Sequence, residues 1–111
     1  MKTLSSIILS TLLLAGTSAL AEEHAATALE HANQAVTHGK AGHASVLVEH
    51  ATAALPHAKK GAEVAKGEAK THMEAGVKSL ESAIEHGKMG HADVATKAAE
   101  EAVEHIKAGN K

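Results

Sequence analysis

Apolar and small residues recur every three to four positions from residue 24 onward, which is the period of an α-helix. When histidine is placed at heptad position c, positions a and d hold mainly aliphatic residues or alanine in four successive segments. Position g is mostly alanine or glycine, so the helix axes can approach to about 8 Å. Because one register fits all four segments, the pattern predicts an all-α fold, an antiparallel four-helix bundle.

The predicted bundle consists of two copies of one helical hairpin. The segment HGKAGHASV at 38–46 returns as HGKMGHADV at 86–94, an offset of 48 residues. At this offset the match extends over roughly 24–60 and 72–108. Internal repetition of a helical hairpin indicates duplication of one structural unit.

Glycine-rich segments mark the expected ends of the helices. Glycines bracket the turns at 39–42 and 87–90, where glycine commonly ends a helix. Pro56 is expected to kink the second helix or to end it near Leu55, because proline lacks a backbone donor. The resulting organisation is a hairpin over 22–60, a connection over 61–68 and a hairpin over 69–108.

Residues 1–21 have the three parts of a secretory signal peptide. Lys2 supplies the positive charge, residues 4–14 are mostly apolar, and Ala19-Leu20-Ala21 is a small-x-small cleavage motif. The apolar run is shorter than the roughly 20 residues that span a membrane, which disfavours an uncleaved anchor. We therefore expect export to the periplasm, a mature domain over 22–111, and no membrane contact after cleavage.

The composition excludes several classes of function. Cysteine, arginine, phenylalanine, tyrosine and tryptophan are all absent, which removes disulfides, thiolate metal sites and c-type haem. The formal net charge is −2, and without a basic patch or stacking aromatics no nucleic-acid partner is expected. Large aliphatic residues are few, so the core alone should give the fold only marginal stability. A ligand that binds only the folded chain would add to that stability.

Ten histidines occupy the same heptad position, spaced by seven or fourteen residues within each helix. Seven residues make two helical turns, so each group lies along one helix face. Histidine is the commonest metal ligand in proteins, and this alignment predicts metal binding. The predicted ligands are His24, His31, His38, His43, His50, His57, His72, His86, His91 and His105.

The histidines are also predicted to pair across each hairpin. Residues at equal height in an antiparallel hairpin have a constant sum, and the sum is 81 in the first hairpin and 177 in the second. The predicted pairs are His24 with His57, His31 with His50, His38 with His43, His72 with His105, and His86 with His91. The remaining position carries Ser79 and Ala98, so both histidines are missing there.

Each predicted ion takes one histidine from each helix, because neighbours along one helix are about 10.5 Å apart and metal–nitrogen bonds are near 2 Å. Water or carboxylate would complete the shell. Glu68 and Glu101 lie one turn before His72 and His105, so this pair has the most carboxylates available as additional ligands. A further copper site could form after cleavage, from the new amine of Glu22 and the third residue, His24.

Imidazole with carboxylate or water suits Cu(II), Zn(II) and Ni(II), and the affinity order favours copper. The absence of thiolates and an oxidising compartment argue against Cu(I). The chain contains neither Glu-x-x-His nor His-Glu-x-x-His, the sequences typical of di-iron enzymes and zinc hydrolases. We therefore expect no enzymatic activity.

The cysteine-free, histidine-rich heptads, the HGK-x-GHA turns and the signal peptide resemble the small metal-binding proteins from the periplasm of ammonia-oxidising bacteria. The resemblance covers essentially all of 22–108. It implies a monomeric four-helix bundle that binds several divalent ions, copper foremost, for scavenging or tolerance. It also implies that the ten histidines are the ligands.

Three other interpretations remain at this point. The histidines could be solvated surface residues, although such faces normally carry glutamate and lysine. An alanine-, lysine- and glutamate-rich chain could be a stress protectant that is disordered until it is dried or bound. The chain could also respond to pH, because ten imidazoles titrating together would change its charge greatly.

Overall fold

The computed structural model describes residues 19–110 and contains four helices and no strand in that range. The helices are α2 (Ala19–Lys40), α3 (Ala44–Val64), α4 (Gly67–Lys88) and α5 (Ala92–Gly109). The predicted all-α bundle is therefore confirmed. None of the described helices combines the length and the apolar character that a membrane span requires. The predicted signal peptide lies outside the described residues except for its last three, which begin α2.

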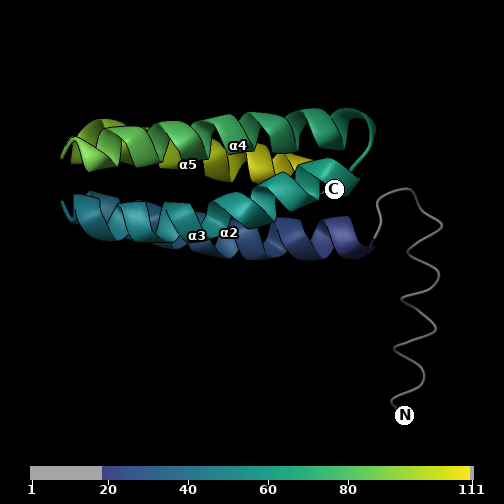
Figure 1. The fold of residues 1–111 in the computed structure, drawn as a ribbon, viewed down its shortest axis with the longest axis horizontal. Helices are drawn as coiled ribbons and strands as arrows, with labels where there is room; N and C mark the ends of the chain where they lie inside the picture. The colour runs from purple at the N-terminus through teal and green to yellow at the C-terminus, as the bar shows by residue number, and fades with distance from the viewer. Residues whose placement is uncertain (1–18, 111) are drawn as a thin grey trace, which may run out of the picture.

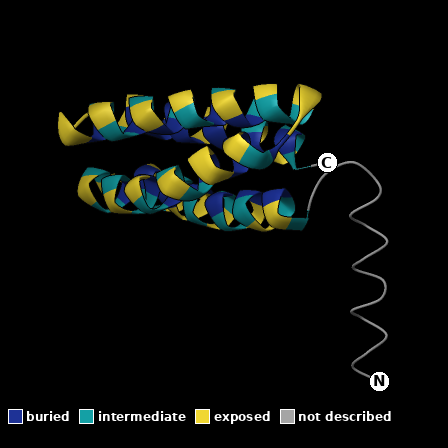
Figure 2. Cartoon of the chain, turned by 45° about the vertical axis from the view of Figure 1, so that its right-hand side comes forward, coloured by how far each residue is buried: buried dark blue, intermediate teal, exposed yellow. Residues whose placement is uncertain are grey.

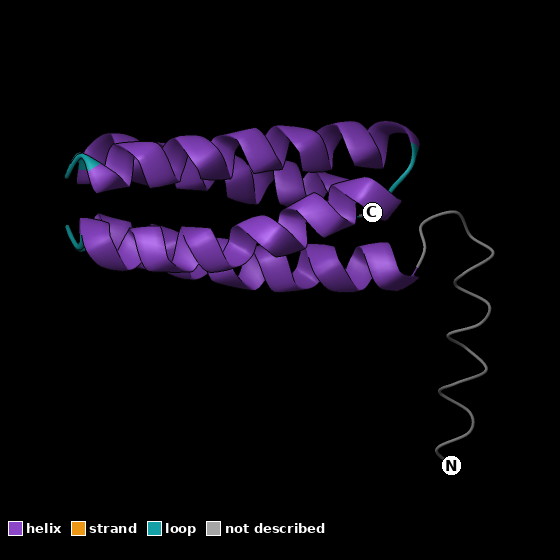
Figure 3. Cartoon of the chain, in the orientation of Figure 1, coloured by secondary structure: helices purple, strands orange, loops and turns teal. Residues whose placement is uncertain are grey.

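The two hairpins form two layers of the bundle. Figure 1 shows α2 beside α3 in one layer and α4 beside α5 in the other, with the two hairpin turns at the same end of the molecule. The most extensive contacts are those within each hairpin, and α3–α4 and α2–α5 contacts join the layers. The connection between the hairpins lies at the opposite end (Figure 3). The bundle therefore has two seams within hairpins and two seams between them.

Each hairpin turn is a Schellman motif, the commonest glycine-based helix stop. In the first turn, His43 N–H donates to the His38 carbonyl at 2.9 Å and Gly42 N–H donates to the Gly39 carbonyl at 2.9 Å. Gly42 has φ of +84°, a left-handed conformation that glycine adopts without steric cost. The second turn repeats these bonds at the equivalent residues, with Gly90 at φ +81°. This local geometry fixes the first histidine pair of each hairpin.

Small residues form most of the core. Positions d and g of the four helices are largely buried, and alanine or glycine fills most of them. The burial pattern in Figure 2 places these residues on the inner faces of the helices. The aliphatic residues at position a, such as Leu29, Val36, Val48 and Leu55, are only half-buried and pack at the edge of this core. The buried strip is therefore centred between d and g, and not between a and d as the heptad pattern predicts.

Glycines inside the helices make room for the few large buried side chains. A Cβ on Gly87 would lie 2.5 Å from Val48 Cγ2, and one on Gly76 would lie 2.9 Å from Ile106 Cγ1. A Cβ on Gly39 would meet the side chain of Thr96. Gly39 and Gly87, which the sequence predicts as turn residues, are therefore packing residues within helices.

The connection between the hairpins is shorter than the predicted 61–68. Helix α3 continues past Gly61 to Val64, and α4 begins at Gly67. Gly61 is buried within α3, next to Met73. Lys70 Nζ donates to the Ala62 carbonyl at 2.8 Å, which satisfies a carbonyl in the last turn of α3.

Pro56 does not end the second helix, which continues for eight residues beyond it. Proline cannot donate to the carbonyl of the preceding turn, and this loss bends a helix without necessarily ending it. The ribbon of α3 changes direction near its middle (Figure 3), in agreement with the predicted kink. Pro56 is exposed, so the missing backbone bond faces solvent.

Candidate metal centre

The histidines lie along the two seams within the hairpins. On a helical wheel, positions c and a flank the buried d/g strip on opposite sides. Position c faces the partner helix of the same hairpin, as the histidine ring contacts show, and position a faces the other hairpin. Eight of the ten histidines are half-buried, whereas His43 and His91, at the N-caps of α3 and α5, are exposed. The rings therefore combine partial packing with access to ions from solvent.

All five pairs of equal height bring their rings close together. The ring centroids are 5.5 Å apart for His24–His57, 6.1 Å for His31–His50, 6.3 Å for His38–His43, 6.2 Å for His72–His105 and 6.4 Å for His86–His91. With metal–nitrogen bonds of about 2.0–2.1 Å, two imidazoles on one ion have centroids about 5 to 6.5 Å apart, depending on the bond angle. The centroid spacing of each pair therefore lies within the range for a shared ion, and rotation of the rings would direct one nitrogen of each ring at it.

Two further contacts in the first hairpin were not predicted. His38 and His50 are 5.2 Å apart with ring planes at 6°, and His31 and His57 are 6.5 Å apart at 13°. These diagonal contacts join neighbouring pairs. Pairing by constant sum missed them because it assigns each residue one partner. A side chain on an antiparallel helix can also lie between two residues of the facing row, and which of them it approaches depends on how the two helices interdigitate.

The pair His24–His57 has the most direct ligand geometry. The two Nδ1 atoms are 3.3 Å apart, within hydrogen-bond distance when one ring carries its proton on Nδ1. Two nitrogens bound at about 2.05 Å to one tetrahedral ion are also separated by about 3.3 Å. An ion could therefore replace the shared proton with little movement of either ring.

Two other ring nitrogens are buried without a partner. His31 Nδ1 and His86 Nδ1 have almost no solvent exposure and accept or donate no hydrogen bond within the protein. A buried polar atom without a partner costs about 1–3 kcal/mol. One of these atoms belongs to each hairpin, so both seams contain imidazole nitrogens that a ligand would satisfy.

The two carboxylates that were predicted to complete a metal site do not lie with the histidines in a three-ligand group. Glu68 and Glu101 are exposed, and no three histidine, aspartate or glutamate side chains of residues 19–110 converge to hold an ion. The pairs therefore supply two protein ligands each. Residues 22–24 are helical, so the predicted amine site would require the first turn to unwind and would compete with the His24–His57 pair.

The unpaired position in the second hairpin is closed by packing. Ala98 is only 6% exposed, whereas the histidines at the same heptad position of α2 and α4 are half-buried. Ser79 is half-buried on the facing helix. This part of the seam thus separates His72–His105 from His86–His91.

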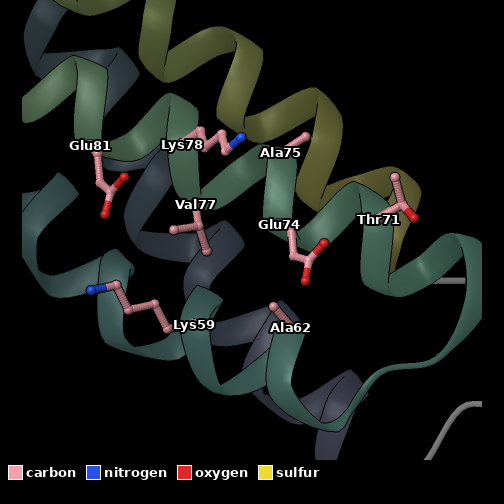
Figure 4. A pocket seen from close by; sticks show the side chains of 8 residues that line it. All are labelled: Lys59, Ala62, Thr71, Glu74, Ala75, Val77, Lys78 and Glu81. Atoms are coloured by element: carbon pink, nitrogen blue, oxygen red, sulfur yellow. The ribbon is translucent and has the colours of Figure 1, made fainter.

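The surface grooves lie elsewhere, on the seams between the hairpins. One of them, of about 610 Å³, runs between α3 and α4 and is lined by lysines, glutamates and small or aliphatic residues (Figure 4). Lys59, Lys78, Glu74 and Glu81 are the charged residues of this groove, and no histidine lines it. Its charged side chains are all exposed, and none of its lining residues is a buried polar group. The chemistry of the molecule is therefore concentrated on the two histidine seams.

Comparison with known proteins agrees with this geometry. A search of curated proteins gives no match. A family model described as small metal-binding protein matches residues 1–109, which is nearly the whole chain. The match supports metal-ion binding in general, and the paired imidazoles are donors suited to it. The chain belongs to the small metal-binding protein family.

Proposed function

We propose that the protein binds several divalent transition-metal ions, Cu(II) foremost, between paired histidines of the two hairpins. The observation that carries this proposal is the spacing of all five cross-helix pairs, 5.5–6.4 Å between ring centroids. An arrangement for solubility alone would have no need to bring imidazoles together in pairs. Five pairs provide about five sites if each holds one ion.

The donor set favours copper over the other candidates. Two imidazoles with water in the open positions suit Cu(II), Zn(II) and Ni(II), and the affinity order places copper first among these. Because each pair supplies only two protein ligands, the sites remain open and their ions exchangeable. A role in scavenging, storage or metal tolerance fits open sites of this kind. The signal-peptide pattern of residues 1–21 supports a periplasmic location for this role.

The test compares two variants that each lose two imidazoles from the second hairpin. H72Q/H105Q removes both members of one pair, whereas H72Q/H86Q removes one member from each of two pairs. If the pairs are the sites, the first variant loses one ion and the second loses two. Isothermal titration of the metal-free full-length protein with Cu(II), Zn(II) and Ni(II) measures the stoichiometry.

Two results would contradict the proposal. Binding of no ion, or of a single ion, by the parent protein would exclude multiple paired sites. Equal losses in the two variants would show that each histidine binds independently of its partner. Circular dichroism of both variants serves as the control, because glutamine is a good helix former and should preserve the bundle.

A further inference from the structure

The six histidines of the first hairpin form an unbroken row of neighbouring rings. Starting at the turn, each ring contacts the next one on the opposite helix, with centroid distances from 5.2 to 6.5 Å. The row runs His43, His38, His50, His31, His57, His24. Its four inner members therefore each have two neighbours at a distance that a shared ion can span.

The second hairpin has no such row. Its ring contacts, all within the described residues, are the two separate pairs His72–His105 and His86–His91. Ser79 and the buried Ala98 occupy the position between them. The two pairs are fourteen residues apart along α4, about 21 Å at 1.5 Å per residue. An ion bound at one pair therefore has no intermediate imidazole through which it could pass to the other pair.

The closest ring contact in the first hairpin is a diagonal one. His38 and His50 are 5.2 Å apart and nearly parallel, closer than His38–His43 at 6.3 Å or His31–His50 at 6.1 Å. An imidazole binds an ion in the plane of its ring, so these two stacked rings must rotate before they share an ion. An ion on this diagonal then uses one histidine from each of two equal-height pairs. Diagonal and equal-height sites are therefore alternatives that compete for the same ligands.

We propose that the first hairpin is one shared multi-ion site for divalent transition metals, in which ions occupy either of two registers. Three ions fill the equal-height pairs, and two ions fill the diagonals His38–His50 and His31–His57. The second hairpin holds two separate ions in fixed pairs. This inference rests on the proposed function and adds the way in which the histidines are shared between ions.

Sharing gives the ions a route along the seam. An ion can move from an equal-height pair to a diagonal by keeping one imidazole and exchanging the other, so it is never released from both ligands at once. No covalent or redox step is involved. In the second hairpin the same movement would require full release, because each histidine has a single neighbouring ring.

The test isolates the first hairpin within the full-length chain. In the parent for this experiment, the four histidines of the second hairpin are replaced by glutamine, which preserves helix propensity. The substitutions are H72Q, H86Q, H91Q and H105Q. Titration with Cu(II) should then give three ions for this parent.

Two variants of this parent distinguish the shared row from fixed equal-height pairs. Each variant loses one histidine from each helix, so the two differ only in which ring contacts remain. H24A/H43A removes the two ends of the row and leaves both diagonals intact, so the shared row predicts two ions. H38A/H57A leaves only His31–His50 in contact and predicts one ion. Fixed equal-height pairs predict one ion for both variants.

Each outcome bears on the proposal. Two ions for H24A/H43A and one for H38A/H57A would support the shared row. One ion for both would overturn it and leave the proposed function in place, whereas no ion bound by this parent would overturn the shared row and the sites proposed for the first hairpin. Circular dichroism of the metal-free variants checks the fold, and a second pair made with glutamine gives the same comparison if alanine destabilises the hairpin.

Discussion

Gly87→Ala should destabilise the bundle even though alanine is the better helix former. The added Cβ would lie 2.5 Å from Val48 Cγ2 and 3.4 Å from Leu47 Cδ2. Val48 is branched at Cβ and confined to one preferred rotamer in a helix, so it cannot turn away without moving its backbone. Overpacking of this kind costs about 1–3 kcal/mol, against about 0.8–1.0 kcal/mol gained in helix propensity. Because a 2.5 Å approach forces the backbone or Val48 to shift, the cost lies in the upper part of this range, about 2–3 kcal/mol, and we expect a net loss of about 1–2 kcal/mol.

The measurement is thermal unfolding of the metal-free protein, followed by circular dichroism. A loss of about 1–2 kcal/mol lowers the Tm by roughly 4–16 °C in a domain of this size. Gly61→Ala is the matched control, because its Cβ would meet the mobile end of Met73 at 2.9 Å and otherwise only atoms at 3.7 Å. That variant should melt at or above the parent temperature. If Gly87→Ala melted as high as Gly61→Ala, the packing role of Gly87 would be refuted.

Two further predictions concern the metal. Protons compete with metal ions for the imidazole nitrogens, so lowering the pH from 7.5 to 5 should weaken binding at a two-histidine site. An unchanged affinity in calorimetry at the two pH values would indicate carboxylate ligands. Cu(II) at 100 times its Kd should stabilise the fold by about 2.7 kcal/mol per site, and equal melting temperatures with and without copper would show that the sites do not depend on the folded bundle.

The repeat and the histidine spacing were sufficient to predict the four helices, their antiparallel order and the heights of the histidines. These features follow from periodicity, which a sequence displays directly. The burial strip was less predictable. Heptad assignment places large residues at the centre, but here alanine and glycine allow the helices to pack closely along d and g. The half-buried position of Val36 and Leu55 is a consequence of that close approach.

Other features depend on contacts between distant residues. The packing roles of Gly39 and Gly87 arise from side chains on other helices. The local sequence does not show these neighbours, so both glycines look like ordinary helix stops. Gly61 was placed in a connection for the same reason. The diagonal contact His38–His50 depends on how the two helices interdigitate, which is a tertiary property. The sequence alone therefore predicted which residues share a seam but not all of their neighbours.

The Schellman turn makes the histidine pairs of one hairpin unequal in their dependence on folding. His38 and His43 are separated by five residues, whereas 33 residues separate His24 from His57. In a flexible chain, closing the longer loop costs about 1.7 kcal/mol more than closing the shorter one. The unfolded chain can therefore hold an ion at the turn more readily than at the open end. Since binding to the unfolded chain offsets ligand-induced stability, ions at the open end contribute most to keeping the bundle folded.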